Sequence, residues 1–137
     1  MTSPLVVAAA SFGVAATSML VTALVARRLG RVNVVDVTWG LALTLVAGVC
    51  AVLSGAVLSG AWSSWLLVGL TGFWGLRLSW HVLQRSRGKG EDPRYEAVLG
   101  GGGFRTAIWK VFVVQGAAIW LVSLPVQAAA VTSDVVW

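Results

Sequence analysis

The sequence predicts an all-α integral membrane bundle of four transmembrane helices, with the amino terminus outside and both basic loops in the cytoplasm. Of the 137 residues, 58% are hydrophobic and only 11% are charged, whereas a soluble domain has about 25% charged residues. Several uncharged windows reach the roughly 20 apolar residues that a helix needs to cross hydrocarbon. The Lys and Arg residues lie beside these windows, as residues that set membrane topology do.

The first two spans are expected at about residues 4–26 and 34–57. Span one has no ionisable side chain, and three arginines follow it. A cleavable secretory signal carries its basic residues before the apolar core, so this order favours an uncleaved span that starts outside. For span two, Asn33 is the expected N-cap, which puts Asp36 at the third helical position.

The third span is expected at about residues 62–83. Three glycines recur in it at a spacing of three, at Gly69, Gly72 and Gly75. They leave a bare strip of backbone, which favours close packing against another helix over a ligand-facing groove. Arg77 falls inside this span, about 10 Å from its cytoplasmic end, and His81 lies one turn beyond it on the same face.

The fourth span is expected at about residues 106–130, after a charged cytoplasmic loop of residues 84–105. Pro125 is expected to kink or end this helix, because proline cannot donate the backbone hydrogen bond. The four spans together predict a single transmembrane domain that covers residues 1–137.

Three ionisable residues inside or next to the spans are candidates for chemistry: Asp36, Arg77 and His81. Such groups need partners in a membrane, and these three are expected at a similar depth, where they would form a polar cavity. Each also has an ordinary interpretation. Asp36 is an acid at a helix N-terminus, Arg77 pairs with another helix or extends to the headgroups, and His81 is partly hydrated. The residues alone leave both interpretations open.

The segment GKGEDPRY at residues 88–95 is the second candidate site. Lys89 and Arg94 are candidates to hold phosphate groups, with Glu91 and Asp92 orienting them. The segment is neither a dinucleotide fingerprint nor a Walker sequence, and spacing alone favours a charged loop that contacts anionic lipid. The same basic residues fit lipid better than nucleic acid. One Cys and one His cannot build a usual structural zinc site, so no metal is expected.

Three stretches of the sequence stand out together: VVDVTWG (residues 34–40), WGLRLSWHVLQRSRGKGEDPRY (residues 74–95) and FVVQGAAIWLVSLPVQA (residues 112–128). They resemble the amino-terminal half of a bacterial membrane family, domain of unknown function 1295. That family is related to the carboxyl-terminal domain of steroid 5-alpha-reductases and to isoprenylcysteine carboxyl methyltransferases. The resemblance covers most of the chain from the second span onward, and span one matches only in hydrophobicity.

The resemblance implies a multi-pass enzyme of the inner cell membrane, an NADPH-dependent oxidoreductase that reduces a lipid-soluble unsaturated substrate. It implies that Asp36, His81 or Tyr95 polarises or protonates the substrate, with Arg77 fixing the acid. It also makes the loop residues candidates for binding the cofactor, namely Lys89, Glu91, Asp92 and Arg94.

The resemblance also implies that the chain is part of something larger. The related enzymes carry a motif of the R-H-P-N-Y-x-G-E type in their carboxyl-terminal half, and nothing like it follows Gln127. We therefore expect one of three situations: the chain is a fragment that is completed by a carboxyl-terminal half, it needs a partner subunit, or it has lost catalysis. Two alternatives stay open: a membrane methyltransferase of the isoprenylcysteine type, and a non-enzymatic scaffold or subunit that binds lipid or a partner.

Overall fold

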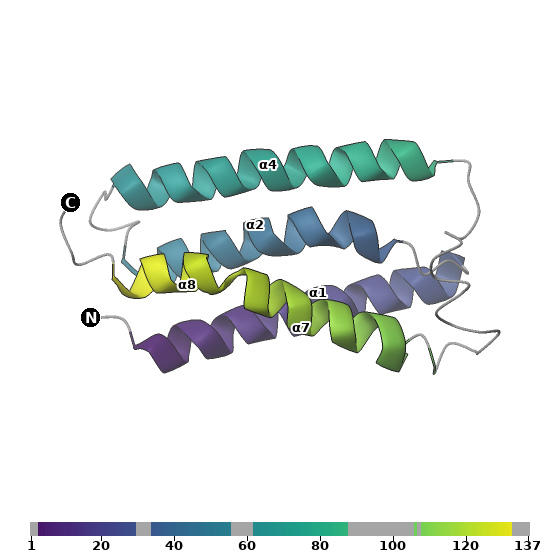
Figure 1. Cartoon of the computed structure of the whole chain (residues 1–137), viewed down its shortest axis with the longest axis horizontal. Helices are drawn as coiled ribbons and strands as arrows, with labels where there is room; N and C mark the ends of the chain where they lie inside the picture. Colours follow the sequence, from purple (N-terminus) through teal and green to yellow (C-terminus); the bar gives the residue numbers. More distant parts are fainter. Residues whose placement is uncertain (1–2, 30–33, 56–61, 88–105, 107, 133–137) are drawn as a thin grey trace.

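The chain folds into an antiparallel bundle of long helices, seen in a computed structural model that describes residues 3–29, 34–55, 62–87, 106 and 108–132. Three of the rods are single helices: α1 (Pro4–Leu29), α2 (Val35–Leu53) and α4 (Trp62–Ser86). The fourth rod is built from three consecutive pieces, η1 (Ile108–Val113), α7 (Val114–Val122) and α8 (Leu124–Val131). In Figure 1, α2 lies between α1 and α4, and the fourth rod lies across α1 and α2.

Four helical segments are long and apolar enough to cross a membrane: Pro4–Leu29, Val35–Leu53, Trp62–Ser86 and Trp109–Val131. This finding confirms the four expected spans, and the chain is a multi-pass membrane protein. The second helix ends earlier than expected, at Leu53 rather than near residue 57. Its C-cap is Ser54, and Gly55 follows with φ of 72°, a left-handed conformation that glycine adopts readily and that ends helices.

The N-cap of α2 corrects one expectation. The N-cap residue is Val34, which makes no side-chain capping hydrogen bond, and not Asn33, which lies outside the described residues. Asp36 is therefore the second helical residue rather than the third. It still lies in the first turn, where the helix dipole favours a negative charge.

The helices α2 and α4 cross with their backbones in contact. A Cβ atom built on Gly40 would overlap the carbonyl oxygen of Gly75, and one built on Gly75 would overlap the carbonyl oxygen of Gly40. Near this contact, the Ser79 hydroxyl donates a hydrogen bond of 2.6 Å to the carbonyl of Val37. The prediction of glycine-mediated packing is thus confirmed for Gly72 and Gly75, which are both buried.

The prediction is wrong for Gly69, which is exposed and would have no neighbour within 4 Å of an added Cβ atom. A spacing of three falls short of one helical turn of 3.6 residues. The glycine strip therefore winds around α4, and its first member faces away from α2.

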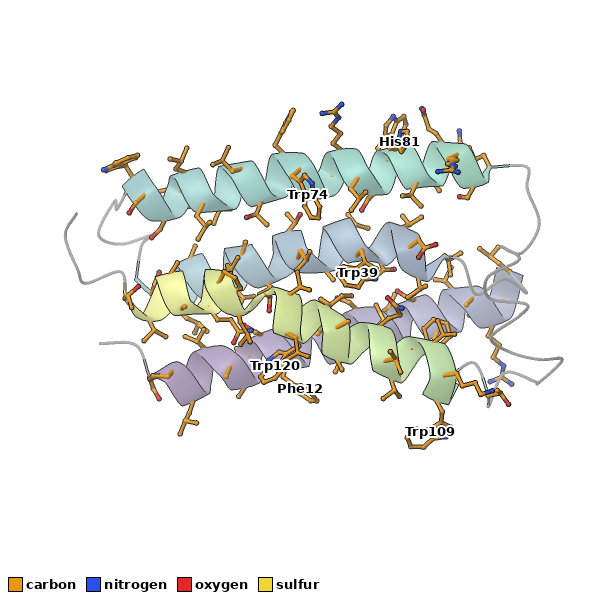
Figure 2. The ribbon with its side chains drawn as sticks, in the orientation of Figure 1. Phe12, Trp39, Trp74, His81, Trp109 and Trp120 are labelled. Atoms are coloured by element: carbon orange, nitrogen blue, oxygen red, sulfur yellow. The ribbon has the colours of Figure 1, made fainter. Side chains whose placement is uncertain are left out.

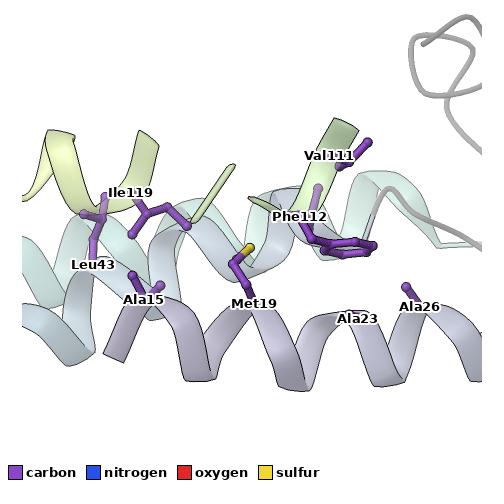
Figure 3. Packing of buried hydrophobic residues seen from close by; sticks show 10 residues of the cluster. Ala15, Met19, Ala23, Ala26, Leu43, Val111, Phe112 and Ile119 are labelled. Atoms are coloured by element: carbon purple, nitrogen blue, oxygen red, sulfur yellow. The ribbon is translucent and has the colours of Figure 1, made fainter. Parts of the chain in front are cut away.

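The other side of α2 packs with α1 and the fourth rod around a small apolar core. Ile119 lies beside Leu43 and Ala15, while Phe112 lies over the end of α1 (Figure 3). The π-helical turn η1 brings two consecutive side chains into this core, Val111 and Phe112, which are 1% and 3% exposed. Nothing in the sequence pattern indicated this wider turn, because it interrupts the helical period.

The fourth rod breaks where the proline predicted a break. Helix α7 ends at Val122, and α8 begins at Leu124 with Pro125 in its first turn. Side chains bond to the interrupted backbone: the Ser123 hydroxyl donates to the Trp120 carbonyl at 2.7 Å, and the Gln127 amide donates to Ser123 Oγ at 2.8 Å. These bonds satisfy polar groups that would otherwise be buried in an apolar environment.

Replacing Gly40 with alanine is expected to destabilise the bundle, because the new methyl group would meet the Gly75 backbone, which cannot rotate out of the way. Overpacking of this kind costs about 1–3 kcal/mol. The free energy of unfolding, measured by titrating micelles of the protein with a denaturing detergent, should fall by that amount. Gly69→Ala is the matched control on an open face, and equal losses in both variants would contradict the crossing.

Candidate functional site

An open apolar groove of about 810 Å³ runs along the pair α1 and α2. Its walls are α1 between Ala10 and Leu29, α2 between Val34 and Val49, and Leu83 of α4. At 1.5 Å per helical residue, the groove is about 22–28 Å long. The fourth rod packs on other residues of α1 and α2, namely those of the apolar core, and so it leaves this groove uncovered.

Toward the amino-terminal end of α1, several residues that line the groove are small. Ala10, Gly13 and Thr17 follow one another at spacings of three and four, which places them on one helix face. An added Cβ atom on Gly13 would meet nothing within 4 Å. The facing wall of α2 carries larger aliphatic side chains, Leu41 and Leu45. A narrow apolar ligand is the kind of molecule that such walls accommodate.

A pair of threonines forms a polar spot in the groove. The hydroxyls of Thr22 and Thr38 lie 2.6 Å apart and join α1 to α2. Thr22 also donates to the Ser18 carbonyl at 2.7 Å. Both threonines lie toward the end of the groove formed by the end of α1 and the start of α2. Since Thr22 gives its proton to Ser18, Thr38 donates to Thr22, and a ligand hydroxyl would find an acceptor in Thr38 Oγ1.

The predicted trio of Asp36, Arg77 and His81 shares a depth but not a face. The contacts of Gly75 with Gly40 and of Ser79 with Val37 set the relative heights of α4 and α2, and they put Arg77 and His81 within about a turn of the height of Asp36.

Arg77 and His81 are both exposed on α4, opposite the buried Gly75 and Ser79, and Figure 2 shows His81 pointing away from α2. Asp36 is half-buried on α2. The structure therefore does not assemble the trio into one cavity, and the catalytic role of each residue stays a prediction.

The candidates from the loop lie outside the described residues: Lys89, Glu91, Asp92, Arg94 and Tyr95. The helix ends on either side of that loop are described, and they gather at one end of the bundle (Figure 1). Basic residues mark this end, which we call the basic end; they are Arg27, Arg28, Arg85, Arg87 and Lys110. At the opposite end the described residues carry no Lys or Arg. Within the described residues, no group of three potential metal ligands occurs.

Two tryptophans tie the helices together by hydrogen bonds that sequence reasoning missed. Trp39 Nε1 donates to Gln115 Oε1 at 2.7 Å, which joins α2 to α7, and Trp120 Nε1 donates to the Ala8 carbonyl at 3.0 Å, which joins α7 to α1. Figure 2 shows Trp120 beside Phe12, and their rings meet edge to face with centroids 6.2 Å apart. Gln115, a polar residue within span four, was the available signal for the first of these bonds, because an amide in an apolar span needs a partner.

Comparison with known proteins identifies a family. A family model described as "Protein of unknown function (DUF1295)" matches residues 22–137. The match begins inside α1, twelve residues before the first of the three resembling stretches, and continues to the last residue. No curated protein and no solved structure matches the chain.

Proposed function

The chain belongs to the DUF1295 family of proteins of unknown function, and on that premise we propose that it is the amino-terminal part of an inner-membrane oxidoreductase. The proposed reaction is the reduction of a lipid-soluble unsaturated substrate by NADPH. The observation that carries the proposal is the apolar groove between α1 and α2, which supports the binding of an elongated hydrocarbon from within the bilayer.

The groove favours a narrow substrate with little polarity. It has small residues on one wall, aliphatic residues on the other and the Thr22–Thr38 pair toward one end. A hydrocarbon with a single oxygen would place that oxygen beside the threonines and its tail toward Ala10. Transfer of such a molecule from lipid into the groove costs little free energy. The shape of the groove and the one hydrogen bond would therefore select it.

The basic end supports the approach of a phosphate-bearing cofactor from water. Guanidinium and ammonium groups pair well with phosphate, and the exposed Arg85 and Arg87 lie where α4 leaves the bundle. NADPH supplies a hydride when it is bound. The threonine pair lies toward this same end of the bundle, so the substrate's oxygen and the cofactor would meet near the start of α2.

Asp36 is the acid among the described residues that lies at the height of the threonine pair. It does not line the groove: two residues along a helix of 3.6 residues per turn, Thr38 lies about 200° around α2 from it. Arg77 and His81 are exposed on the far side of α4. Asp36 and Tyr95, in the loop, therefore both stay candidates for proton transfer, and the groove favours neither.

Filling the groove is expected to weaken ligand binding without damaging the fold. Gly13→Phe places a ring in the open groove, where an added side chain meets no neighbour. Binding of parinaric acid, a conjugated fatty acid whose fluorescence reports an apolar site, should weaken at least about tenfold, equivalent to about 1.4 kcal/mol. The protein would be held in lipid nanodiscs and compared with Gly69→Phe, which adds the same ring to the exposed face of α4. Equal affinity in both variants would contradict a ligand groove.

Cofactor choice is tested by titrating NADPH and S-adenosylmethionine separately into nanodiscs that contain the full-length form, in which the chain is joined to its expected carboxyl-terminal half, with tryptophan fluorescence as the readout. We expect saturable binding of NADPH that weakens about two- to fivefold in Arg85→Gln, the range for an exposed ion pair. Gln84→Ala, at the same helix end, is the control and should bind as the parent does. Binding of S-adenosylmethionine alone would replace the reductase by a methyltransferase, and binding of neither would remove the enzymatic proposal.

A further inference from the structure

The outer face of α4, the side turned away from α2, carries a regular stripe of exposed residues. Successive members are three or four residues apart, which keeps them on one face of the helix. The stripe consists of Leu66, Gly69, Phe73, Arg77, Trp80 and Gln84. Two of its aromatic side chains are among the most exposed apolar groups of the described residues: Phe73 at 71% and Trp80 at 59%.

Arg77 lies deep in the apolar part of this stripe. It precedes Arg85, at the end of the span, by eight residues, which is about 12 Å along the helix axis. Aromatic residues lie on either side of it, Phe73 one turn before and Trp80 one turn after. Within the part of the chain that the structure describes, Arg77 and His81 make neither a hydrogen bond nor an ion pair.

Lipid is a poor environment for this arrangement. A charged side chain facing hydrocarbon is costly, and arginines in spans face a protein interior or a polar partner. Extension to the headgroups serves residues near helix ends, whereas Arg77 is more than two turns from Arg85. Gly69 adds little contact with lipid and weakens the helix, but a small residue lets a second helix approach.

From these observations we propose that the outer face of α4 binds a transmembrane helix that carries a carboxylate at the depth of Arg77. Guanidinium and carboxylate form a paired, charge-assisted hydrogen bond. His81, one turn away on the same face, adds a second donor. Gly69 would permit close approach, while Phe73 and Trp80 would exclude lipid from the ion pair.

Among the described residues, the acid that a second copy of the chain would offer is Asp36, which is half-buried on α2 and already takes part in an interaction. We therefore assign the partner to a different chain. The proposal concerns the opposite face of α4 from α2 and does not depend on the catalytic function proposed above.

The test uses the full chain in phosphatidylcholine vesicles, with a donor fluorophore at its amino terminus. The probe is an acceptor-labelled, leucine-rich transmembrane peptide with one Glu placed about 12 Å from the end that inserts toward the basic end. The matched peptide has Gln at that position. We expect the Glu peptide to associate at least about tenfold more tightly than the Gln peptide, as measured by energy transfer.

Variants of α4 test whether the preference for the Glu peptide depends on Arg77. Arg77→Gln should reduce association of the Glu peptide to the level of the Gln peptide, and Arg77→Lys should restore part of it. Arg85→Gln, at the helix end, is the control and should leave association unchanged. Helix content, measured by circular dichroism, confirms that each variant is folded, as expected for exposed positions.

Three outcomes would overturn the proposal. The first is equal association of the Glu and Gln peptides with the parent chain. The second is Arg77-dependent enrichment of anionic phosphatidylglycerol around the protein without preference for the Glu peptide, which would make Arg77 a headgroup contact. The third is Arg77-dependent energy transfer between labelled copies of the chain in the absence of peptide, which would make the face a homodimer interface.

Discussion

The contact between the backbones of Gly40 and Gly75 determines how α4 is oriented in this bundle. Any side chain at either position would force the helices apart, so the two glycines fix both the height and the rotation of α4 against α2. The hydrogen bond from Ser79 to the Val37 carbonyl, next to this contact, further constrains the orientation of α4 against α2. Because the hydrophobic effect does not drive helices together in lipid, their association depends on close packing and a few hydrogen bonds. The face that α4 turns outward, with Arg77 and His81, is a consequence of this crossing.

The groove depends on how the remaining helices divide the surface of α1 and α2. The fourth rod covers one face of this pair, held by bonds from Trp39 to Gln115 and from Trp120 to Ala8. Helix α4 meets the groove only at Leu83. An elongated apolar surface of α1 and α2 is therefore left uncovered between the fourth rod and α4, with the Thr22–Thr38 pair toward the basic end. In the proposed reaction, this arrangement would bring the lipid-soluble substrate and the phosphate-bearing cofactor to the same end of the bundle, one from lipid and one from water.

Sequence patterns predicted what depends on length and local chemistry. The four spans follow from hydrophobic length, and the break near Pro125 follows from its missing N–H group. The similar depth of Asp36 and Arg77 was also predictable, because both residues lie toward the same end of the bundle. The direction in which each side chain faces was not predictable, because it depends on the rotation of each helix about its axis, which tertiary packing sets. Arg77 therefore lies at the expected height and on the opposite side of α4 from Asp36. The groove and the π-helical turn need three-dimensional packing, and no local pattern indicated either.

The crossing of α2 and α4 is tested most directly by an engineered disulfide. A Cβ atom on Gly72 would lie 3.6 Å from Thr44 Cγ2, so side chains at these two positions are in direct contact, as the two cysteines of a disulfide must be. In a Cys50→Ser background, Thr44→Cys with Gly72→Cys should form an intrachain disulfide in membranes under mild oxidation, detected by labelling of the remaining thiols. Thr44→Cys with Gly69→Cys should form little, because Gly69 faces away from α2. Efficient crosslinking of the Gly69 pair, with none of the Gly72 pair, would show that α4 is rotated differently and would contradict this account.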